Sequence, residues 1–338
     1  MDIKLLEKLT NAYGVSGNES DVRKIITKHI RPYVDKIKVD DLGNLTAIKK
    51  GKKPRIMLAA HMDEIGLMVR GITNQGFLQV SALGGIEPSL LICQRVHVDA
   101  KQRKQLVHGV ITTKEISNDE ELPKRVEMEH LLIDTGLTKK ALKSLGVGVG
   151  SYVALDEKFH LMNHHFFYGK ALDDRIGCFI LLELAKKLKR SKHEIAYVFT
   201  VQEEVGLYGA KTSAYNLEPD IAIAVDVAPS NDLGPDPTLN LGKGPTITIK
   251  DAEMIASVKL NDWLKKVAKK NKISAQLEVS DLGTTDALNI SISKGGIPST
   301  VVGVPIRNMH TAVSVGNLKD VENAVKLLSI ALRNPPHI

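Results

Sequence analysis

Acidic and histidine side chains at five places, spread over about 250 residues, are the part of this sequence that could do chemistry. They are His61 with Asp63, Asp173 with Asp174, Glu203 with Glu204, Asp226, and His310. Most of them stand at or just beyond the end of an apolar run of the kind that forms a buried strand. Taking a carboxylate out of water costs several kcal/mol unless the carboxylate is paired or bound to a metal. We therefore expect a cation beside them.

The spacing within two of these places indicates a division of roles. Residues i and i+2 of an extended segment point the same way, so Asp63 can orient the imidazole of His61 within one pocket. Glu203 and Glu204 are adjacent and point apart. One of the two can therefore bind a metal while the other stays free to move a proton.

The set as a whole fits particular metals. Asp173 and Asp174 open a helical stretch over 175–188, where the helix dipole favours a carboxylate, although an acidic N-cap is common without any metal. Two histidines and four or five carboxylates, with no cysteine among them, suit Zn²⁺, Co²⁺ or Mn²⁺ better than a structural thiolate site.

The apolar runs before these residues predict the fold. Near-continuous apolar strands with helical stretches between them are typical of a sheet covered on both faces, and such sheets bind ligands beyond the carboxyl ends of their strands. We therefore predict an α/β fold with a mixed sheet flanked by helices on both faces. The runs cover 54–60, 196–201, 221–225 and 298–304.

A change of pattern predicts a second domain. From about Leu67 to Leu155 the chain consists of short alternating segments separated by glycines and charged turns, which predicts a small β-rich, barrel-like insert. Residues 1–66 and 157–338 are then one discontinuous catalytic domain, and residues 67–156 are the insert. Helices are predicted over 2–13, 19–33 and 319–333, and a hairpin over 36–51.

Composition excludes several classes of function. The 338 residues carry a net charge of +7, from 46 basic against 39 acidic side chains, but the lysine clusters are dispersed and aromatic residues make up only 4%. Nucleic acid is therefore not an expected partner. An apolar run of about 18 residues is missing, so no membrane span is predicted. Cys93 and Cys178 stand in apolar surroundings and are predicted to be buried free thiols, and we expect a cytoplasmic protein.

Five segments carry a resemblance to a known family. They are LAAHMDEIGLMV (58–69), GKALDDRIG (169–177), VFTVQEEVGLYGA (198–210), AVDVA (224–228) and RNMHTAV (307–313). In this order they resemble the TET-type, glutamyl-aminopeptidase-like family of two-metal metallopeptidases, from near the first residue to the C-terminus. The resemblance implies a metal-dependent aminopeptidase that cleaves the N-terminal residue from peptides through a metal-bridged water.

The resemblance also implies a role for each matching residue. One metal is held by His61, Asp173 and Asp226, and the other by Asp173, Glu204 and His310, so Asp173 bridges them. Glu203 matches the general base and Asp63 the carboxylate that orients the first histidine. In that family the insert contributes to subunit contacts, and dimers assemble into a tetrahedral dodecamer, which implies a homo-oligomer here.

Other positions depart from the family pattern or carry no expected role. Asn308 replaces a common aromatic residue and Gly283–Asp286 replaces a Gly-Gly-Thr-Asp segment, so the substrate preference stays open. Thr285 and Asp286 can line the pocket or cap a helix that runs through Ser293.

Glu64 is expected to face away from the pocket. His164 and His165, adjacent in the chain, are expected to have a structural or surface role because neighbours in a strand face opposite ways and cannot readily share one metal. No carboxylate constellation is expected around His97 or His108, and no role is assigned to them.

Three other functions compete with the aminopeptidase. An amino-acid deacylase uses the same ligands but needs an inserted lid domain that supplies a histidine, and the small insert has no catalytic cluster. An endoglucanase-type glycoside hydrolase needs paired carboxylates and aromatic platforms, yet the chain has one Trp and no use for His61 and His310 in that role. A non-catalytic scaffold is disfavoured because every expected site residue is present.

Overall fold

The computed structural model describes residues 1–100, 105–118, 120, 121 and 123–336. Eight strands form one mixed sheet, in the spatial order β1 (Lys36–Val39), β2 (Leu45–Lys49), β12 (His193–Thr200), β3 (Lys52–His61), β13 (Ile221–Pro229), β16 (Ser299–Ile306), β14 (Thr246–Lys250) and β15 (Gln276–Val279). The central strands β12, β3, β13 and β16 are parallel. Their carboxyl ends therefore meet at one edge, where Thr200 pairs with His61 and Asp226 pairs with Gly303.

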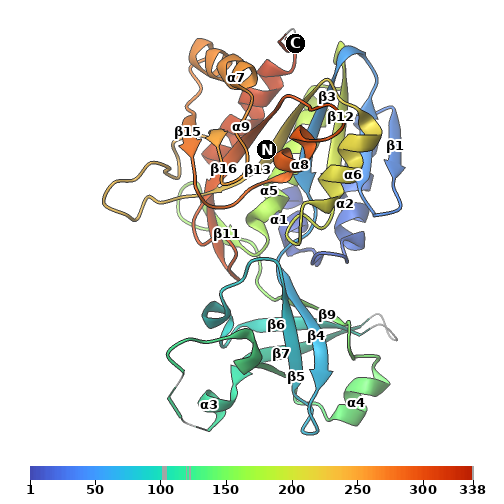
Figure 1. Cartoon of the computed structure of the whole chain (residues 1–338), viewed down its shortest axis with the longest axis vertical. Coiled ribbons are helices and arrows are strands. Elements are labelled where there is room, and N and C mark those ends of the chain that lie inside the picture. The colour runs from blue at the N-terminus through green and yellow to red at the C-terminus, as the bar shows by residue number, and fades with distance from the viewer. Residues whose placement is uncertain (101–104, 119, 122, 337–338) are drawn as a thin grey trace.

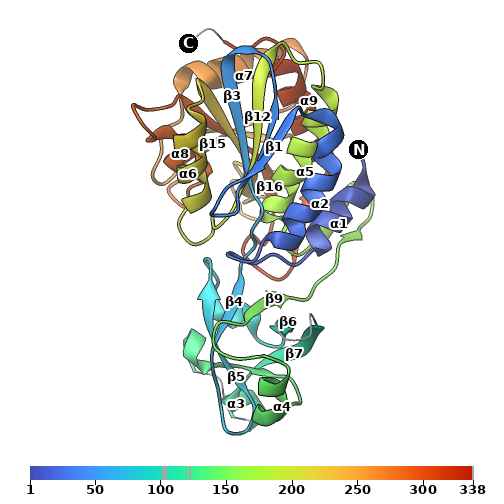
Figure 2. The same ribbon diagram turned by 90° about the vertical axis from the view of Figure 1, so that its right-hand side faces the viewer.

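Helices cover both faces of this sheet, as predicted. Side chains alternate along β3, so Ile56 and Leu58 pack into one apolar cluster while Met57 and Ala59 pack into another. The first cluster includes side chains of α1 (Ile3–Asn11), α2 (Ser20–Ile30), α5 (Leu172–Lys187), α7 (Val258–Lys270) and α9 (Leu318–Ala331). The second includes side chains of α6 (Tyr208–Leu217) and α8 (Asp286–Ser291). Figure 2 shows the sheet between these two layers.

Local sequence explains where two of these helices begin. Asp2 caps α1, its side chain accepting a hydrogen bond from the N–H of Leu5, and Asn317 caps α9 in the same way at Lys319. The predicted helix 19–33 ends earlier, at Ile30, and continues as a single 3-10 turn, η1 (Arg31–Tyr33). A proline at position 32 has no N–H to continue the α-helical ladder.

A closed antiparallel barrel forms the other end of the molecule (Figures 1 and 2). Its strands, in order around the barrel, are β4 (Gly66–Ile72), β5 (Leu78–Leu83), β8 (Leu131–Asp134), β7 (Gln105–Thr113), β6 (Arg95–Ala100) and β9 (Tyr152–Leu155). Its connections contain η2 (Pro88–Leu91), α3 (Lys114–Ser117), η3 (Met128–His130) and α4 (Lys139–Ser144). The barrel has its own apolar core, including Val69, Val98 and Ile133. The predicted barrel-like insert is therefore present. The domain boundaries, with residues 67–156 as the insert, stay a prediction.

A small sheet links the barrel side to the last helix. It consists of β10 (His160–Leu161), β11 (Phe166–Gly169) and β17 (Ser314–Asn317), in that order. Because β17 pairs with β11, the segment that carries His310 is held next to the segment that leads into Asp173.

One expectation about the cysteines is wrong. Cys178 is buried in α5, but Cys93 is exposed. Cys93 lies in the turn before β6 with a φ of 65°, and this turn directs its side chain outward although the neighbouring residues are apolar.

None of the helices among the described residues is long and apolar enough to span a membrane. The cytoplasmic location stays a prediction.

Candidate metal centre

His61 and Asp63 stand at the carboxyl end of β3, on the same side of the chain. His61 Nδ1 lies 3.2 Å from the carbonyl oxygen of Asp63 and 3.5 Å from its Oδ1. Three further groups fix the Asp63 carboxylate: the hydroxyl of Ser16 donates at 2.6 Å, and the N–H groups of Glu203 and Glu204 donate at 3.1 and 3.2 Å. The buried Asp63 therefore connects the end of β3 to the loop that follows β12.

Asp173 lies between the two histidines. Its Oδ1 is 3.0 Å from His61 Nε2, and its Oδ2 is 3.3 Å from His310 Nε2. His310 Nε2 is also 3.5 Å from Oε2 of Glu204. Asp174 plays a different part, since it is fully buried and accepts hydrogen bonds from the N–H groups of His61 and Gly177.

Asp226 and Glu203 complete the cluster from the other side. Asp226 Oδ1 and Glu203 Oε2 each lie 4.0 Å from His61 Nε2. The N–H of Val227 donates to Asp226 at 2.7 Å, which fixes that carboxylate. The structure thus brings together all seven residues that the sequence singled out for this centre, although Glu203, the expected base, lies as close to His61 as the expected ligand Asp226 does.

The separations between ligand atoms fit a divalent metal. Ligand atoms about 2.0–2.1 Å from a tetrahedral ion lie roughly 3.3–3.4 Å from one another. The contacts of Asp173 with the two histidines, at 3.0 and 3.3 Å, and of His310 with Glu204, at 3.5 Å, match this spacing. Glu204 Oε1 is buried and has no hydrogen-bond partner among the described residues, so it has a lone pair free for an ion.

The electrostatics of the cluster also favour cations. Burial and the charge of Asp173 raise the pKa of Asp226 to about 7 and that of Glu204 to about 8. Burial raises the pKa of Glu203 well above its ordinary value as well. Burial alone would lower the pKa of His310, but its hydrogen bond with Asp173 and the charge of Glu204 raise it to about 9. The carboxylates therefore outnumber the positive charge that the protein itself supplies.

A buried ion network holds these strand ends in place. Glu64 points away from the pocket, as expected, and pairs with Lys170 Nζ at 2.6 Å and with Arg175 Nη2 at 3.3 Å. Arg175 also donates to the carbonyl oxygens of Met62 and Leu9, at 2.8 and 2.6 Å. This network joins the chain just after β3, the start of α5 and the end of α1.

The cluster opens into a cavity of about 320 Å³. No sequence pattern indicated most of its far wall, which includes Thr248, Asp251, Glu278, Leu282 and Met309. The types of these residues carry no catalytic pattern, and the pairing of β14 with β15 and with β16 brings Thr248 and Glu278 to this wall. Thr285 lines the cavity and also caps α8, so both interpretations of this residue hold.

The remaining histidines separate into two kinds. His164 and His165 are exposed and belong to no group of potential metal ligands among the described residues. The expectation that His97 and His108 have no carboxylate near them is wrong, because Asp156 lies beside both. The three residues come from different strands and strand ends of the barrel, so their proximity cannot be read from sequence spacing.

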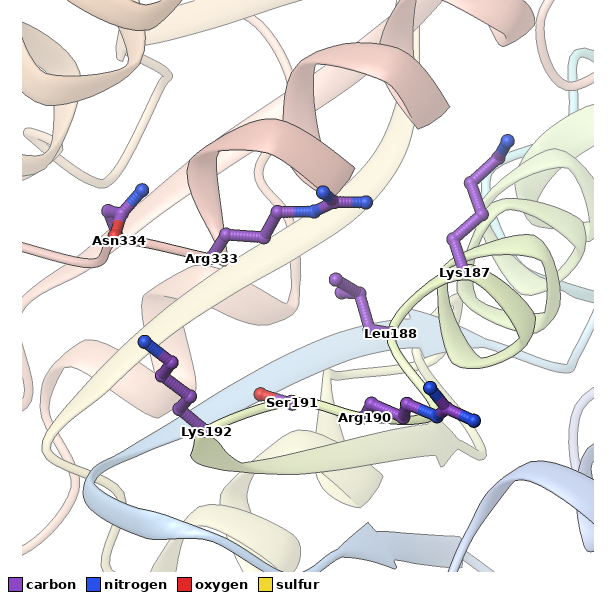
Figure 3. Close-up of a pocket in the computed structure, with 7 residues that line it drawn as sticks. All are labelled: Lys187, Leu188, Arg190, Ser191, Lys192, Arg333 and Asn334. Carbon is purple, nitrogen blue, oxygen red and sulfur yellow. The ribbon is translucent and has the colours of Figure 1, made fainter.

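A second pocket is basic and lies away from the centre (Figure 3). Its lining includes Lys187, Arg190, Lys192 and Arg333 and contains no carboxylate. Lys192 precedes β12, so this pocket lies at the amino ends of the parallel strands. Lys187 ends α5 and Arg333 follows α9, where cations favourably complement the helix dipole, so the pocket's charge has a structural explanation.

A covered, largely parallel sheet whose carboxyl edge carries two histidines among carboxylates defines a class, the metal-dependent peptide hydrolases. The model of one family, described as M42 glutamyl aminopeptidase, matches residues 43–327, and the chain belongs to this family. The lysyl aminopeptidase of Pyrococcus furiosus is 33% identical over 98% of this chain and 97% of its own length.

Two solved structures give the same result. The aminopeptidase APDkam598 of Desulfurococcus kamchatkensis superposes with a TM-score of 0.94 at 36% identity, over 98% of this chain and 94% of the other. The TET1 peptidase of Pyrococcus horikoshii, described as able to assemble into a tetrahedron or a large octahedral shell, gives 0.87 at 33% identity, over 98% and 99%. The chain is therefore a metal-dependent aminopeptidase, and neither the deacylase nor the glycoside hydrolase is favoured.

Proposed function

We propose that the chain removes single N-terminal residues from peptides at a centre for two divalent ions, Zn²⁺ or Co²⁺, with Mn²⁺ as a third candidate. The observation that carries this proposal is the position of Asp173. Its two carboxylate oxygens face two different histidines, His61 at 3.0 Å and His310 at 3.3 Å. A carboxylate placed in this way can bridge two ions.

The proposed ligand sets follow from these contacts. His61, Asp173 and Asp226 would hold one ion, and Asp173, Glu204 and His310 would hold the other. Ions held by these residues would supply Lewis-acid chemistry, polarising the scissile carbonyl and lowering the pKa of a bound water.

Glu203 is the proposed general base. Its carboxylate lies at the edge of the cluster, 4.0 Å from His61 Nε2, and lines the cavity where a peptide would enter. It is placed to take a proton from the attacking water and to return it to the leaving amine. Asp63 is proposed to position His61, because its own carboxylate is fixed by Ser16 and by two backbone N–H groups.

The far wall of the cavity supports a preference for substrates with a basic first residue. Asp251 and Glu278 are buried carboxylates that line it, and no Lys or Arg is among the lining residues. Burial raises the pKa of Glu278 above its ordinary value, and hydrogen bonds from the hydroxyls of Thr248, at 2.6 Å, and Thr246 limit this rise because they favour the charged form. Leu282 and Met309 provide apolar surface for the stem of a lysine side chain.

An oligomer is proposed from the relatives. The TET1 peptidase of Pyrococcus horikoshii can assemble into a tetrahedron or a large octahedral shell, and a tetrahedral assembly of this chain would be a dodecamer built from dimers. The barrel, residues 67–156, is the proposed dimerisation domain, with residues 1–66 and 157–338 as the catalytic domain. Size-exclusion chromatography with light scattering measures the assembly directly.

Replacing the base tests the mechanism. Glu203→Gln keeps the shape of the side chain but cannot take a proton, so we expect kcat to fall by about 10²–10⁴-fold. Metal analysis of the same preparation is expected to give the wild-type metal content. Activity near that of the wild type would show that Glu203 is not the base, and loss of metal would show that it is a ligand.

A substrate panel tests the preference. Lysyl-, leucyl- and glutamyl-p-nitroanilides are compared by kcat/KM, and the lysyl substrate is expected to be the best. A charge-assisted hydrogen bond contributes about 1.5–3 kcal/mol, so Glu278→Gln should lower the lysyl-to-leucyl ratio by roughly ten- to a hundredfold. Asp281→Asn is the matched control, because Asp281 is exposed and pairs with Lys250. A ratio unchanged by Glu278→Gln would contradict the assignment of this pocket.

A further inference from the structure

Two histidines of the barrel face each other across a strand pair. His97 on β6 and His108 on β7 are directly opposite in the antiparallel register, so their side chains leave the same face, with ring centroids 4.5 Å apart. Their neighbours Val96 and Val98 belong to the barrel core, so His97 points out of the barrel. It is nevertheless only 5% exposed, and the ring of Tyr13 contacts it at a centroid distance of 4.7 Å.

A carboxylate completes this cluster. Asp156 directly follows β9, and its Oδ1 lies 2.7 Å from His97 Nε2. The N–H of Asp156 donates to the carbonyl oxygen of Arg95 at 2.9 Å, which fixes the carboxylate beside β6. One potential ligand atom from each of His97, His108 and Asp156 lies within 4.8 Å of the other two.

One nitrogen of the His97 ring has no partner. His97 Nδ1 is buried and makes no hydrogen bond within the described residues, while Nε2 contacts Asp156. The present contacts therefore do not satisfy the ring, and a neutral imidazole nitrogen is a metal ligand.

An ion can reach the cluster from solvent. His108 and Asp156 line a cavity of about 390 Å³, which leaves room for a water as a fourth ligand. Lys158 Nζ is the nearest competing cation, 3.7 Å from Asp156 Oδ1, and Tyr13 OH is 3.5 Å from the same atom. The Lys158 side chain is half exposed, so it can turn into solvent when an ion binds.

We propose that His97, His108 and Asp156 form a further divalent-metal site in the barrel, separate from the catalytic centre. Two imidazoles, one carboxylate and a water give the four-coordinate nitrogen and oxygen set that suits Zn²⁺. The ion would tie the β6–β7 hairpin to the segment that leaves the barrel after β9. Its role would be structural, since among the described residues the ligand group contains Asp156 as its one carboxylate, and the other carboxylate of the cavity, Asp134, lies outside that group.

Metal analysis of the full-length protein tests this site. Wild type and His108→Gln are loaded with excess Zn²⁺, desalted and measured for zinc per subunit and for aminopeptidase activity. His108 is exposed, so its replacement should not affect folding. We expect His108→Gln to hold one ion fewer per subunit with unchanged kcat, and the control His165→Gln, also an exposed histidine, to match the wild type in both. Because a difference is measured, the result does not depend on how many ions the catalytic centre holds.

A second variant should strengthen the site. Removing the unit charge of Lys158, about 4 Å from the carboxylate, is expected to tighten zinc binding by about fivefold at low ionic strength, from the Coulomb energy at the dielectric constant of water. Competition of Lys158→Ala against a zinc indicator dye measures this change. Equal zinc contents for wild type and His108→Gln, or an affinity unchanged by Lys158→Ala, would overturn the proposal. So would a loss of activity in His108→Gln without any loss of zinc.

Discussion

Among the residues that the structure describes, the Glu64 carboxylate is the one ion-pair partner of two buried cations, and its removal gives a sharp prediction. Among the described residues, the side chains of Lys170 and Arg175 are 1% and 0% exposed, and Glu64 itself is 2% exposed. Glu64→Gln keeps the size of the side chain but leaves both cations without a counter-charge. Breaking a buried ion pair by removing one partner costs about 3–5 kcal/mol.

The ability of Lys170 to lose its proton sets an upper limit on this loss of stability. Burial lowers the pKa of Lys170 from 10.5 to about 8. In the variant the lysine can escape its unpaired charge by losing its proton, which at pH 7 costs about 1.4 kcal/mol for each unit below 10.5, or roughly 5 kcal/mol. At about 2.1 cal/mol/K per residue for 338 residues, a loss of about 3–5 kcal/mol lowers the unfolding midpoint by roughly 4–7 °C.

The same reasoning fixes the sign of the pH dependence. If Lys170 is neutral in the folded variant, the unfolded chain binds one more proton, so the stability of the variant rises with pH. Wild-type Lys170 stays charged below its folded pKa of about 8, so it contributes no such slope there. The difference in the free energy of unfolding between wild type and Glu64→Gln should therefore narrow by up to about 1.4 kcal/mol per pH unit from about pH 7 to pH 8, in proportion to the neutral fraction of Lys170.

Thermal and urea unfolding of the metal-loaded proteins, at one fixed protein concentration, measure the difference in stability between wild type and Glu64→Gln. Asp21→Asn is the control, because it breaks the exposed Lys24–Asp21 pair and should leave the midpoint nearly unchanged. Adding Lys170→Met to Glu64→Gln removes an unpaired cation and should recover part of the loss. A midpoint for Glu64→Gln within about 1 °C of the wild type would refute the reasoning.

Three further predictions concern the centre and its loops. His310→Ala should bind one ion fewer in metal analysis and lose activity, and an unchanged metal content would exclude it as a ligand. Gly85→Ala would place a Cβ 3.2 Å from His310 Nδ1, so we expect a lower kcat than for the control Gly148→Ala, which meets no atom within 4 Å. Asp232→Asn removes the negative charge and one of the two oxygens that accept from Arg307, the contacts that lower the Asp232 pKa to about 2. It should therefore destabilise at pH 7 by about 2 kcal/mol in urea unfolding, and this difference should vanish as the pH falls toward 2.

The sequence predicted the sheet and the approach of the seven centre residues for a simple physical reason. Apolar runs mark strands buried on both faces, and parallel strands bring their carboxyl ends to one edge. His61 and Asp226 lie 165 positions apart in the chain, yet each stands at the end of such a run. Their proximity therefore follows from the pairing of parallel strands, which the apolar runs of the sequence predict.

What the sequence could not predict depends on register and on turns. His97 and His108 meet only because of the pairing of β6 with β7, and a shift of one residue would put them on opposite faces of the barrel wall. Glu278 faces the cavity because β15 pairs with β14, and a carboxylate in a short edge strand has no pattern that marks it as a pocket residue. Cys93 is exposed because of its backbone turn, which its apolar neighbours do not indicate.

The barrel also contributes to the catalytic centre, because one of its turns lies against two of the expected metal ligands. Gly84 follows β5 with a φ of 91°, and a Cβ there would lie 3.0 Å from Glu204 Oε2. Gly85 approaches His310 in the same way. Only residues without a side chain allow this turn to lie so close to two expected ligands. A movement of the barrel relative to the sheet would therefore shift Gly84 and Gly85 against Glu204 and His310. The position of the proposed dimerisation domain is thus coupled to the geometry of the catalytic centre.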